Sequence, residues 1–143
     1  MDEYKIKITR PESNYWIFNF ASNEEDLNLF ASNFMHPINS LLYSVRMLLK
    51  GSTKSEVSLI DEPGQYVIDL ERIDETLKIK VFSFKDFRGT NRNRELGNLM
   101  LSCLFNFDKF LNQIINSLYP LTSDKEILLN EVVELRKMGY DKK

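Results

Sequence analysis

The sequence contains few of the residues from which disulfides and metal sites are built. One cysteine and one histidine in 143 residues exclude an internal disulfide and a metal centre with several His or Cys ligands. A single cysteine is typical of a protein in a reducing cytoplasm. Glycine and proline are also scarce, at five and four residues, which favours long regular elements.

Long apolar runs and an excess of one charge are missing as well. The densest apolar segment, residues 99–105, is too short to span a bilayer, and residues 1–5 lack the apolar segment of a signal peptide. The net charge of −2 argues against a nucleic-acid-binding surface. We therefore expect a cytoplasmic protein that binds neither membranes nor nucleic acid.

The sequence is rich in large apolar side chains, with 43% hydrophobic and 12% aromatic residues. Its length predicts a single domain covering residues 1–143. Residues 5–9 and 15–20 alternate in the manner of two antiparallel strands. In the second of these segments we expect Trp16, Phe18 and Phe20 to face the core.

Apolar residues at three- and four-residue spacing predict three helices. The first covers residues 22–49, begins at a capping box of Ser22 and Glu25, and is kinked at Pro37. The second covers residues 96–118 and ends before Pro120. The third covers residues 124–138, begins at a capping box in residues 123–126, and ends before Gly139.

Between the first two helices, alternating segments at 57–59, 66–71 and 77–82 predict a three-stranded antiparallel meander. A type II turn on Pro63 and Gly64 and a turn on Asp74 and Glu75 connect these strands. The predicted apolar pairs are Val57 with Leu70, Leu59 with Ile68, Leu70 with Ile79 and Ile68 with Val81. The predicted charged pairs on the opposite face are Asp69 with Lys80 and Glu71 with Lys78.

These elements predict the α+β class. We expect a two-layer sandwich with one sheet of about five antiparallel strands, in the order ββ-α-βββ-α-α. The long helices cover one face of this sheet.

The reactive side chains do not match a known catalytic motif. His36 is interpreted as a residue of the helix surface beside Pro37. Cys103 is interpreted as a buried and inert thiol, because it is in phase with the apolar residues around it. No catalytic residue, metal or cofactor is predicted, and we expect that the protein is not an enzyme.

Charged residues gather in two places. Asp69 and Glu71 are interpreted as part of a solvated charge ladder, with an acidic docking surface for a basic partner as the alternative. Residues 85–94 form a polar loop that contains Lys85, Arg88, Arg92 and Arg94. Whether this basic loop binds an anion stays open at this point.

Apolar residues on the outer side of the predicted sheet are the best candidate for an interface, because large exposed apolar patches mark interaction sites. Together with two acidic neighbours, the candidate interface residues are Tyr15, Ile17, Ile60, Val67, Asp69, Glu71, Phe82 and Phe84. This patch would contact a protein partner or a second copy of the chain.

A resemblance to small, mostly uncharacterised bacterial α+β proteins lies in the segments EPGQYVIDL at 62–70 and IDETLKI at 73–79. The likeness covers about residues 15–118. Some proteins of this group resemble immunity partners of bacterial toxins. The resemblance implies a structural scaffold and supplies no catalytic residue.

The predicted function is therefore a non-enzymatic protein-interaction module of a bacterial cytoplasm. Its specific form would be an immunity protein that neutralises a toxin, and a homodimer is the other form of contact that we expect. The alternative is a small-ligand-binding domain with a pocket between the helices and the sheet.

Overall fold

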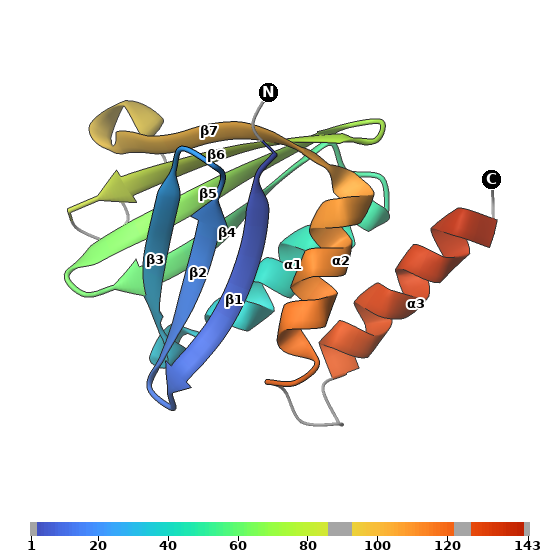
Figure 1. Cartoon of the computed structure of the whole chain (residues 1–143), viewed down its shortest axis with the longest axis horizontal. Helices are drawn as coiled ribbons and strands as arrows, with labels where there is room; N and C mark the ends of the chain where they lie inside the picture. Colours follow the sequence, from blue (N-terminus) through green and yellow to red (C-terminus); the bar gives the residue numbers. More distant parts are fainter. Residues whose placement is uncertain (1–2, 86–92, 122–126, 142–143) are drawn as a thin grey trace.

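The computed structural model describes residues 3–85, 93–121 and 127–141 (Figure 1). In these residues the chain forms two antiparallel sheets and three α-helices. The first sheet consists of β1 (Lys5–Glu12), β2 (Tyr15–Ala21) and β3 (Asp26–Ser32). The second consists of β4 (Lys54–Asp61), β5 (Gly64–Ile73), β6 (Thr76–Phe84) and β7 (Asn98–Asn106). The α-helices are α1 (Pro37–Leu49), α2 (Phe107–Leu118) and α3 (Ile127–Asp141), and short 3₁₀ turns are η1 (Asn33–Met35) and η2 (Arg94–Leu96).

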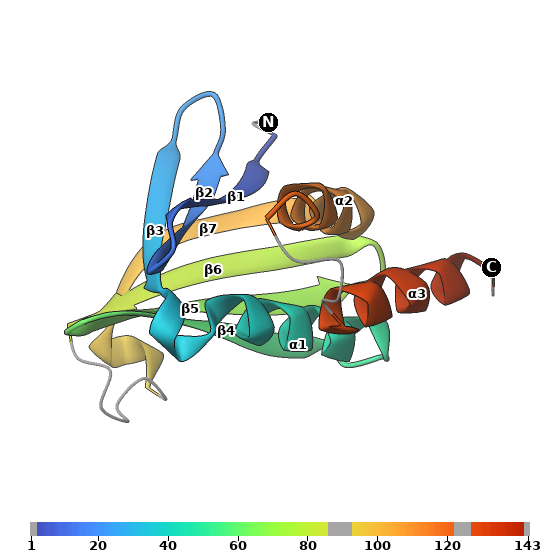
Figure 2. The same cartoon turned by 90° about the horizontal axis from the view of Figure 1, so that it is seen from below.

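The two sheets cross at a steep angle and enclose the core between them (Figures 1 and 2). Trp16, Phe18 and Phe20 of β2 are buried in this core, as predicted, and so are Ile68 and Leu70 of β5. Figure 2 shows β1–β3 on one side of the four-stranded sheet and η2 on the other. The α+β class is confirmed, but the expectation of about five strands in one sheet is wrong.

The first missed strand is β3, which lies inside the predicted helix at 22–49. Its inward residues Leu29 and Ala31 are fully buried and pair with Phe18 and Trp16 of β2. The predicted capping residues form a tight turn instead: the Ser22 hydroxyl accepts hydrogen bonds from the backbone N–H groups of residues 24 and 25. Hydrogen bonds of this kind from a serine hydroxyl can either begin a helix or close a hairpin turn. Here the pairing of β3 with β2 favours the hairpin.

Pro37 starts α1 and does not kink a longer helix. It occupies the first turn, where its missing N–H has no helical partner to lose. His36 before it adopts a left-handed conformation with φ of 52°, and its carbonyl accepts a hydrogen bond from the N–H of Ser40. Gly51, with φ of 112°, directly follows Lys50 at the end of the helix, a position that favours glycine.

The second missed strand is β7, which takes up the first half of the predicted helix at 96–118. Leu101, Cys103 and Phe105 point into the core at a spacing of two, whereas the residues between them are exposed. Helix α2 begins only at Phe107, where the side chain of Asn106 caps it by accepting the N–H of Lys109 at 3.0 Å.

The meander is confirmed as β4–β5–β6, with one change of register. In the second hairpin all four predicted pairs of β5 and β6 are present. In the first hairpin Val57 pairs with Ile68, and Leu59 pairs with Tyr66, two residues away from the predicted partners. The turn is centred on Glu62 and Pro63, with a cis peptide bond between them, and is not a type II turn on Pro63 and Gly64. A shift by two residues leaves the inward face unchanged.

Helix α1 covers the outer edge of β4. The backbone N–H of Ser58 donates to the Ser40 hydroxyl at 3.0 Å, and the Ser44 hydroxyl contacts the carbonyl oxygen of Glu56. The Ser55 hydroxyl in turn donates to the carbonyl of Ser44 at 3.1 Å. Serine side chains of the helix thus supply the hydrogen-bond partners that a neighbouring strand would otherwise provide.

Helix α2 covers the edge of β1 in the same way. The N–H groups of Ile6 and Ile8 donate to Gln113 Oε1 at 2.8 Å and to Ser117 Oγ at 3.2 Å, respectively. Because Gln113 and Ser117 are four residues apart, both project from one face of the helix. Each sheet therefore has one edge that is closed by a helix.

The third predicted helix is confirmed as α3, but its predicted end before Gly139 is wrong, because α3 continues to Asp141. Its predicted capping box in residues 123–126 lies outside the described residues. Two ion pairs attach α3 to the other helices: Arg46 with Glu131 at 2.7 Å, and Arg136 with Asp108 at 2.8 Å. No helix in the described ranges is long and apolar enough to cross a membrane.

Candidate functional site

The face of the four-stranded sheet that is turned away from β1–β3 carries no helix in the described part of the chain, apart from the short η2 (Figure 2). Strand register arranges its side chains in rows that cross the strands in the order β4, β5, β6 and β7. These rows are Lys54–Glu71–Lys78–Leu104, Glu56–Asp69–Lys80–Ser102 and Ser58–Val67–Phe82–Leu99. The face is therefore charged at one end and more apolar at the other.

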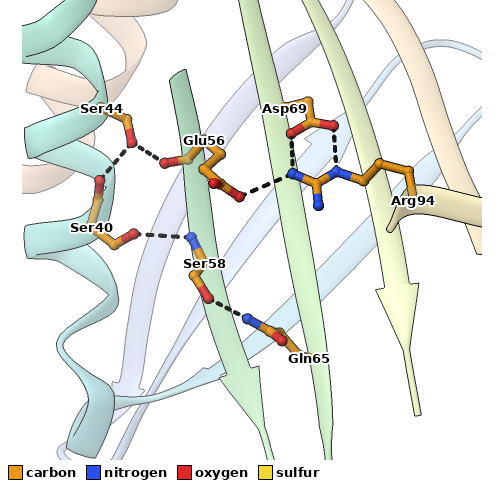
Figure 3. A network of polar contacts seen from close by, with 7 residues as sticks. All are labelled: Ser40, Ser44, Glu56, Ser58, Gln65, Asp69 and Arg94. Atoms are coloured by element: carbon orange, nitrogen blue, oxygen red, sulfur yellow. Dashed lines mark hydrogen bonds and ion pairs between the residues drawn. The ribbon is translucent and has the colours of Figure 1, made fainter. Parts of the chain in front are cut away.

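Arg94 of η2 holds the middle of this face. Its Nε and Nη2 atoms donate to the two carboxylate oxygens of Asp69, each at 2.8 Å (Figure 3). Nη2 also donates to Glu56 Oε2 at 3.0 Å, and the guanidinium lies 5.9 Å from the centre of the Phe82 ring. The hydrogen bonds to Asp69 raise the pKa of Arg94. Arg94 thereby attaches η2 to β4 and β5, and its single positive charge is shared by two neighbouring carboxylates.

Beyond Arg94 the apolar end of the face is covered. Ile60, Val67 and Phe84 are less than one-tenth exposed. Gly97, directly after η2, packs so closely that a Cβ atom on it would lie 2.7 Å from Cε1 of Phe84. The absence of a side chain at this position allows the segment after η2 to lie on the Phe84 ring.

The charged end of the face contains an open groove of about 270 Å³. Its lining residues are Lys54, Ser55, Asp69, Leu70, Glu71, Lys78 and Lys80. The carboxylate of Glu71 lies 3.8 Å from Lys54 Nζ, and the carboxylate of Asp69 forms an ion pair with Arg94. Within the described residues neither Lys78 nor Lys80 has an ion pair or a side-chain hydrogen bond. This end of the groove can therefore bind carboxylate groups of another molecule.

Three large apolar side chains are exposed next to the groove, on the edge strand β7. Leu99 is 55% exposed, Met100 is 42% exposed and Leu104 is 57% exposed. Leu104 ends the row of Lys78 and Leu99 ends the row of Phe82, while Met100 lies in the bulge between Leu99 and Leu101 and has no partner in β6. A group of exposed apolar residues is typical of a surface that binds another protein.

The eight residues predicted as an interface do not form one exposed patch. Tyr15 and Ile17 lie half-buried on β2, in the other sheet, whereas the remaining six lie in the four-stranded sheet. Three of these six, Ile60, Val67 and Phe84, are buried, and Phe82 is half-buried beside Arg94. Asp69 and Glu71 line the groove, but their carboxylates contact Arg94 and Lys54. The structure therefore disfavours the acidic docking surface.

The single cysteine and the single histidine lie apart from this face. Cys103 is buried, and burial, with a further contribution from the Glu25 carboxylate, raises its pKa to about 12. This agrees with the interpretation of an inert thiol. His36 is exposed at the start of α1. No three His, Cys, Asp or Glu side chains of the described residues are grouped so that they could hold a metal ion.

Arg94, Met100 and Leu104 are the main residues of this face that the sequence interpretation missed. Arg94 was assigned to a basic loop with an open role, and its partners Asp69 and Glu56 are 25 and 38 residues away in the sequence. Met100 and Leu104 lie within residues 96–118, whose apolar spacing predicts a helix. Asn98 and Asn106, which flank a short uncharged and mostly apolar segment, are the signal that could have identified β7.

Comparisons of the chain with family models, with curated proteins and with solved structures give no match.

Proposed function

We propose that the protein is a non-enzymatic interaction module that binds a protein partner on the exposed face of its four-stranded sheet. The observation that carries this proposal is the pair Lys78 and Lys80, which lie side by side in the groove without an ion pair among the described residues. Two such lysines attract an acidic segment of a partner and steer its approach.

The partner that we propose is a bacterial toxin, with this protein acting as its cytoplasmic immunity protein. The support for this class of partner is the sequence resemblance of residues 62–79 to the group that includes such proteins. An immunity protein needs a rigid docking face and no reactive centre, because it acts by covering the toxin. The groove beside Leu104 offers both charge and apolar contact for that purpose.

The groove also bears on the alternative of a ligand pocket between helices and sheet. It is lined by β4, β5 and β6 on the face turned away from the other sheet. Its position therefore favours contact with a partner's surface over enclosure of a small molecule.

The test is co-expression of the protein with each toxic protein encoded next to its gene. The variant Lys78→Gln/Lys80→Gln removes both unpaired charges and leaves polar, uncharged side chains in their place. The matched control is Lys5→Gln/Lys7→Gln, because these exposed lysines on β1 have the same spacing on the other sheet.

We expect the wild type and the control to restore growth, and the groove variant to restore it poorly. Purified groove variant should bind the toxin with an association rate about tenfold lower at low salt, a difference that added salt reduces. Equal protection by both variants would show that the docking site lies elsewhere. Failure of the wild type against every neighbouring toxic protein would contradict the immunity function.

A further inference from the structure

The outer edge of β7 offers backbone hydrogen-bonding groups to another strand. Backbone direction alternates along a strand, and antiparallel pairing passes this alternation from one strand to the next. The backbone groups of Glu56 and Ser58 are directed away from β5, toward α1. Carried through the register from β4 to β7, the alternation directs the backbone groups of Ser102 and Leu104 away from β6. Among the described residues, no hydrogen bond joins these outward groups to a partner.

The composition of β7 leaves this edge open to pairing. Native edge strands are usually protected by charged residues, by proline, by shortness or by a covering element. The nine residues of β7 contain no charged residue, no proline and no glycine. The bulge of the strand lies between Leu99 and Leu101, and residues 101–106 pair regularly with β6. The edges of β1 and β4, by contrast, are covered by α2 and α1. The four-stranded sheet can therefore be extended at β7.

The side chains beside this edge favour an acidic strand. Ser102 and Leu104 end the rows that contain Lys80 and Lys78 of β6. Both lysines are half-buried and have no ion pair within the described part of the chain. A strand added to β7 would lie two strand spacings, about 10 Å, from β6. Because lysine has a flexible four-carbon stem, Lys80 and a glutamate of the added strand can meet over the short side chain of Ser102.

Leu104 adds an apolar contact to this charge. Its side chain is exposed in the single chain and lies on the same face as the two lysines. In the added strand, a residue two positions from the acidic one stands on that face beside Leu104. An apolar side chain there would pair with Leu104 across the strands. The strand that fits this edge therefore has an acidic and an apolar residue two positions apart.

We propose that the protein partner contributes an extended acidic segment that pairs with β7 as a further strand of the four-stranded sheet. The backbone of the segment bonds to Ser102 and Leu104, and its acidic side chain meets Lys80. This inference rests on the proposed function, because it specifies how the partner occupies the same face. It adds one requirement that contact with the groove alone lacks, namely that the outward backbone groups of β7 are used.

The first test measures amide hydrogen exchange in the protein alone and with a short synthetic peptide. Threonine occupies every second position of the peptide, and glutamate and leucine alternate between the threonines. In the free protein, the N–H groups of Ser102 and Leu104 should exchange rapidly. The N–H of Cys103, which the register directs toward β6, should exchange slowly.

At saturation the acidic peptide should slow exchange at Ser102 and Leu104 about tenfold or more, and leave Cys103 unchanged. A peptide with lysine in place of glutamate is the control and should have no such effect. Slow exchange at Ser102 in the free protein would overturn the proposal, as would an acidic peptide that slows exchange at neither residue.

The second test uses the toxic protein that the wild type neutralises in the co-expression experiment. Ser102→Pro removes an outward N–H and keeps the pairing with β6, because proline is tolerated where the N–H of an edge strand faces solvent. It should weaken binding about tenfold or more. Asn28→Pro is the matched control, because the same alternation directs the N–H of Asn28 on β3 away from β2. Circular dichroism checks the fold of both variants. If Ser102→Pro does not fold, exchange at Ser102 in the complex of the wild type decides, and rapid exchange there would overturn the proposal.

The outcomes separate this inference from the proposed function. If Lys78→Gln/Lys80→Gln weakens binding and Ser102→Pro does not, the partner lies on the face without adding a strand. The inference is then wrong, whereas the proposed function stands. If the acidic peptide slows exchange at Ser102 and Leu104 but no neighbouring toxic protein is neutralised, β7 binds acidic strands and the immunity function is wrong.

Discussion

The serine contacts between α1 and β4 give the sharpest prediction about stability. Ser40 accepts the N–H of Ser58, and Ser44 contacts the carbonyl of Glu56. In the variant Ser40→Ala/Ser44→Ala both backbone groups lose their partners. Ser44 is 4% exposed, so water does not readily replace its hydroxyl group. We therefore expect the double variant to be clearly less stable than the wild type.

The size of this effect follows from two opposing contributions. An unpaired and shielded backbone group costs about 2 kcal/mol, and alanine returns about 0.5 kcal/mol per site through its higher helix propensity. The double variant should therefore lose about 3 kcal/mol of unfolding free energy. An unfolding entropy of about 2.1 cal/mol/K per residue over 143 residues converts this loss into a fall in Tm of roughly 10 °C.

The assay is urea unfolding followed by circular dichroism, with Asn39→Ala as the control. Asn39 is exposed on the same helix, so its replacement by alanine changes helix propensity without removing a contact of β4. We expect the control to be neutral or slightly stabilising. A double variant within about 0.5 kcal/mol of the wild type would refute the argument that these hydroxyls satisfy the edge of β4.

Three further predictions concern single residues. Gly97→Ala should lower the free energy of unfolding, measured in urea, by about 1–3 kcal/mol, because the alanine Cβ would lie 2.7 Å from a ring carbon of Phe84. An unchanged free energy of unfolding would contradict this packing. Burial raises the pKa of the Cys103 thiol to about 12, so the thiol is protonated at pH 8. Ellman's reagent should therefore react slowly with the native protein and rapidly with the protein unfolded in urea. Rapid labelling of the native protein would disprove the burial of this thiol. Arg94→Lys replaces two parallel hydrogen bonds to Asp69 by one contact and should lower the free energy of unfolding by about 1 kcal/mol. Unchanged stability would show that Arg94 does not stabilise the position of η2.

The second hairpin could be predicted from the sequence down to its register. Residues of β5 and β6 alternate strictly, and the charges on the outer face are complementary only in the register that is observed. Every local preference agrees there with the final structure, which is the condition under which sequence patterns are reliable. In the first hairpin the sequence determined which residues face inward, but not the turn, because shifts by two residues preserve the pattern.

The strand β3 could not be distinguished from a helix by periodicity alone. Leu27, Phe30, Ala31 and Phe34 fit a helical stripe, and Leu27, Leu29 and Ala31 fit a strand equally well. The decisive residue is Leu29, which has no place in the helical stripe and is fully buried. Pairing with the aromatic strand β2 overrides the local capping signal at Ser22.

The contacts of Arg94 with Asp69 and Glu56 could not be predicted from the sequence for a different reason. The direct pairing of Glu56 with Asp69 depends on the first hairpin, whose register was predicted two residues away. In the predicted register the two carboxylates are not neighbours, so no site for a bidentate arginine is apparent. Contacts between distant segments require the correct register first, and only then can charge pairing be inferred.

The misassignment of β7 has a physical cause in the composition of the strand. A strand with one face in water normally alternates apolar and polar residues, and such a pattern would have been recognised as a strand. In β7 Leu104 and Met100 place apolar groups on the outward face as well, which extends the pattern into a continuous run that also fits a helix. Within a single copy these two side chains remain exposed, so the core of one chain does not account for their apolar character.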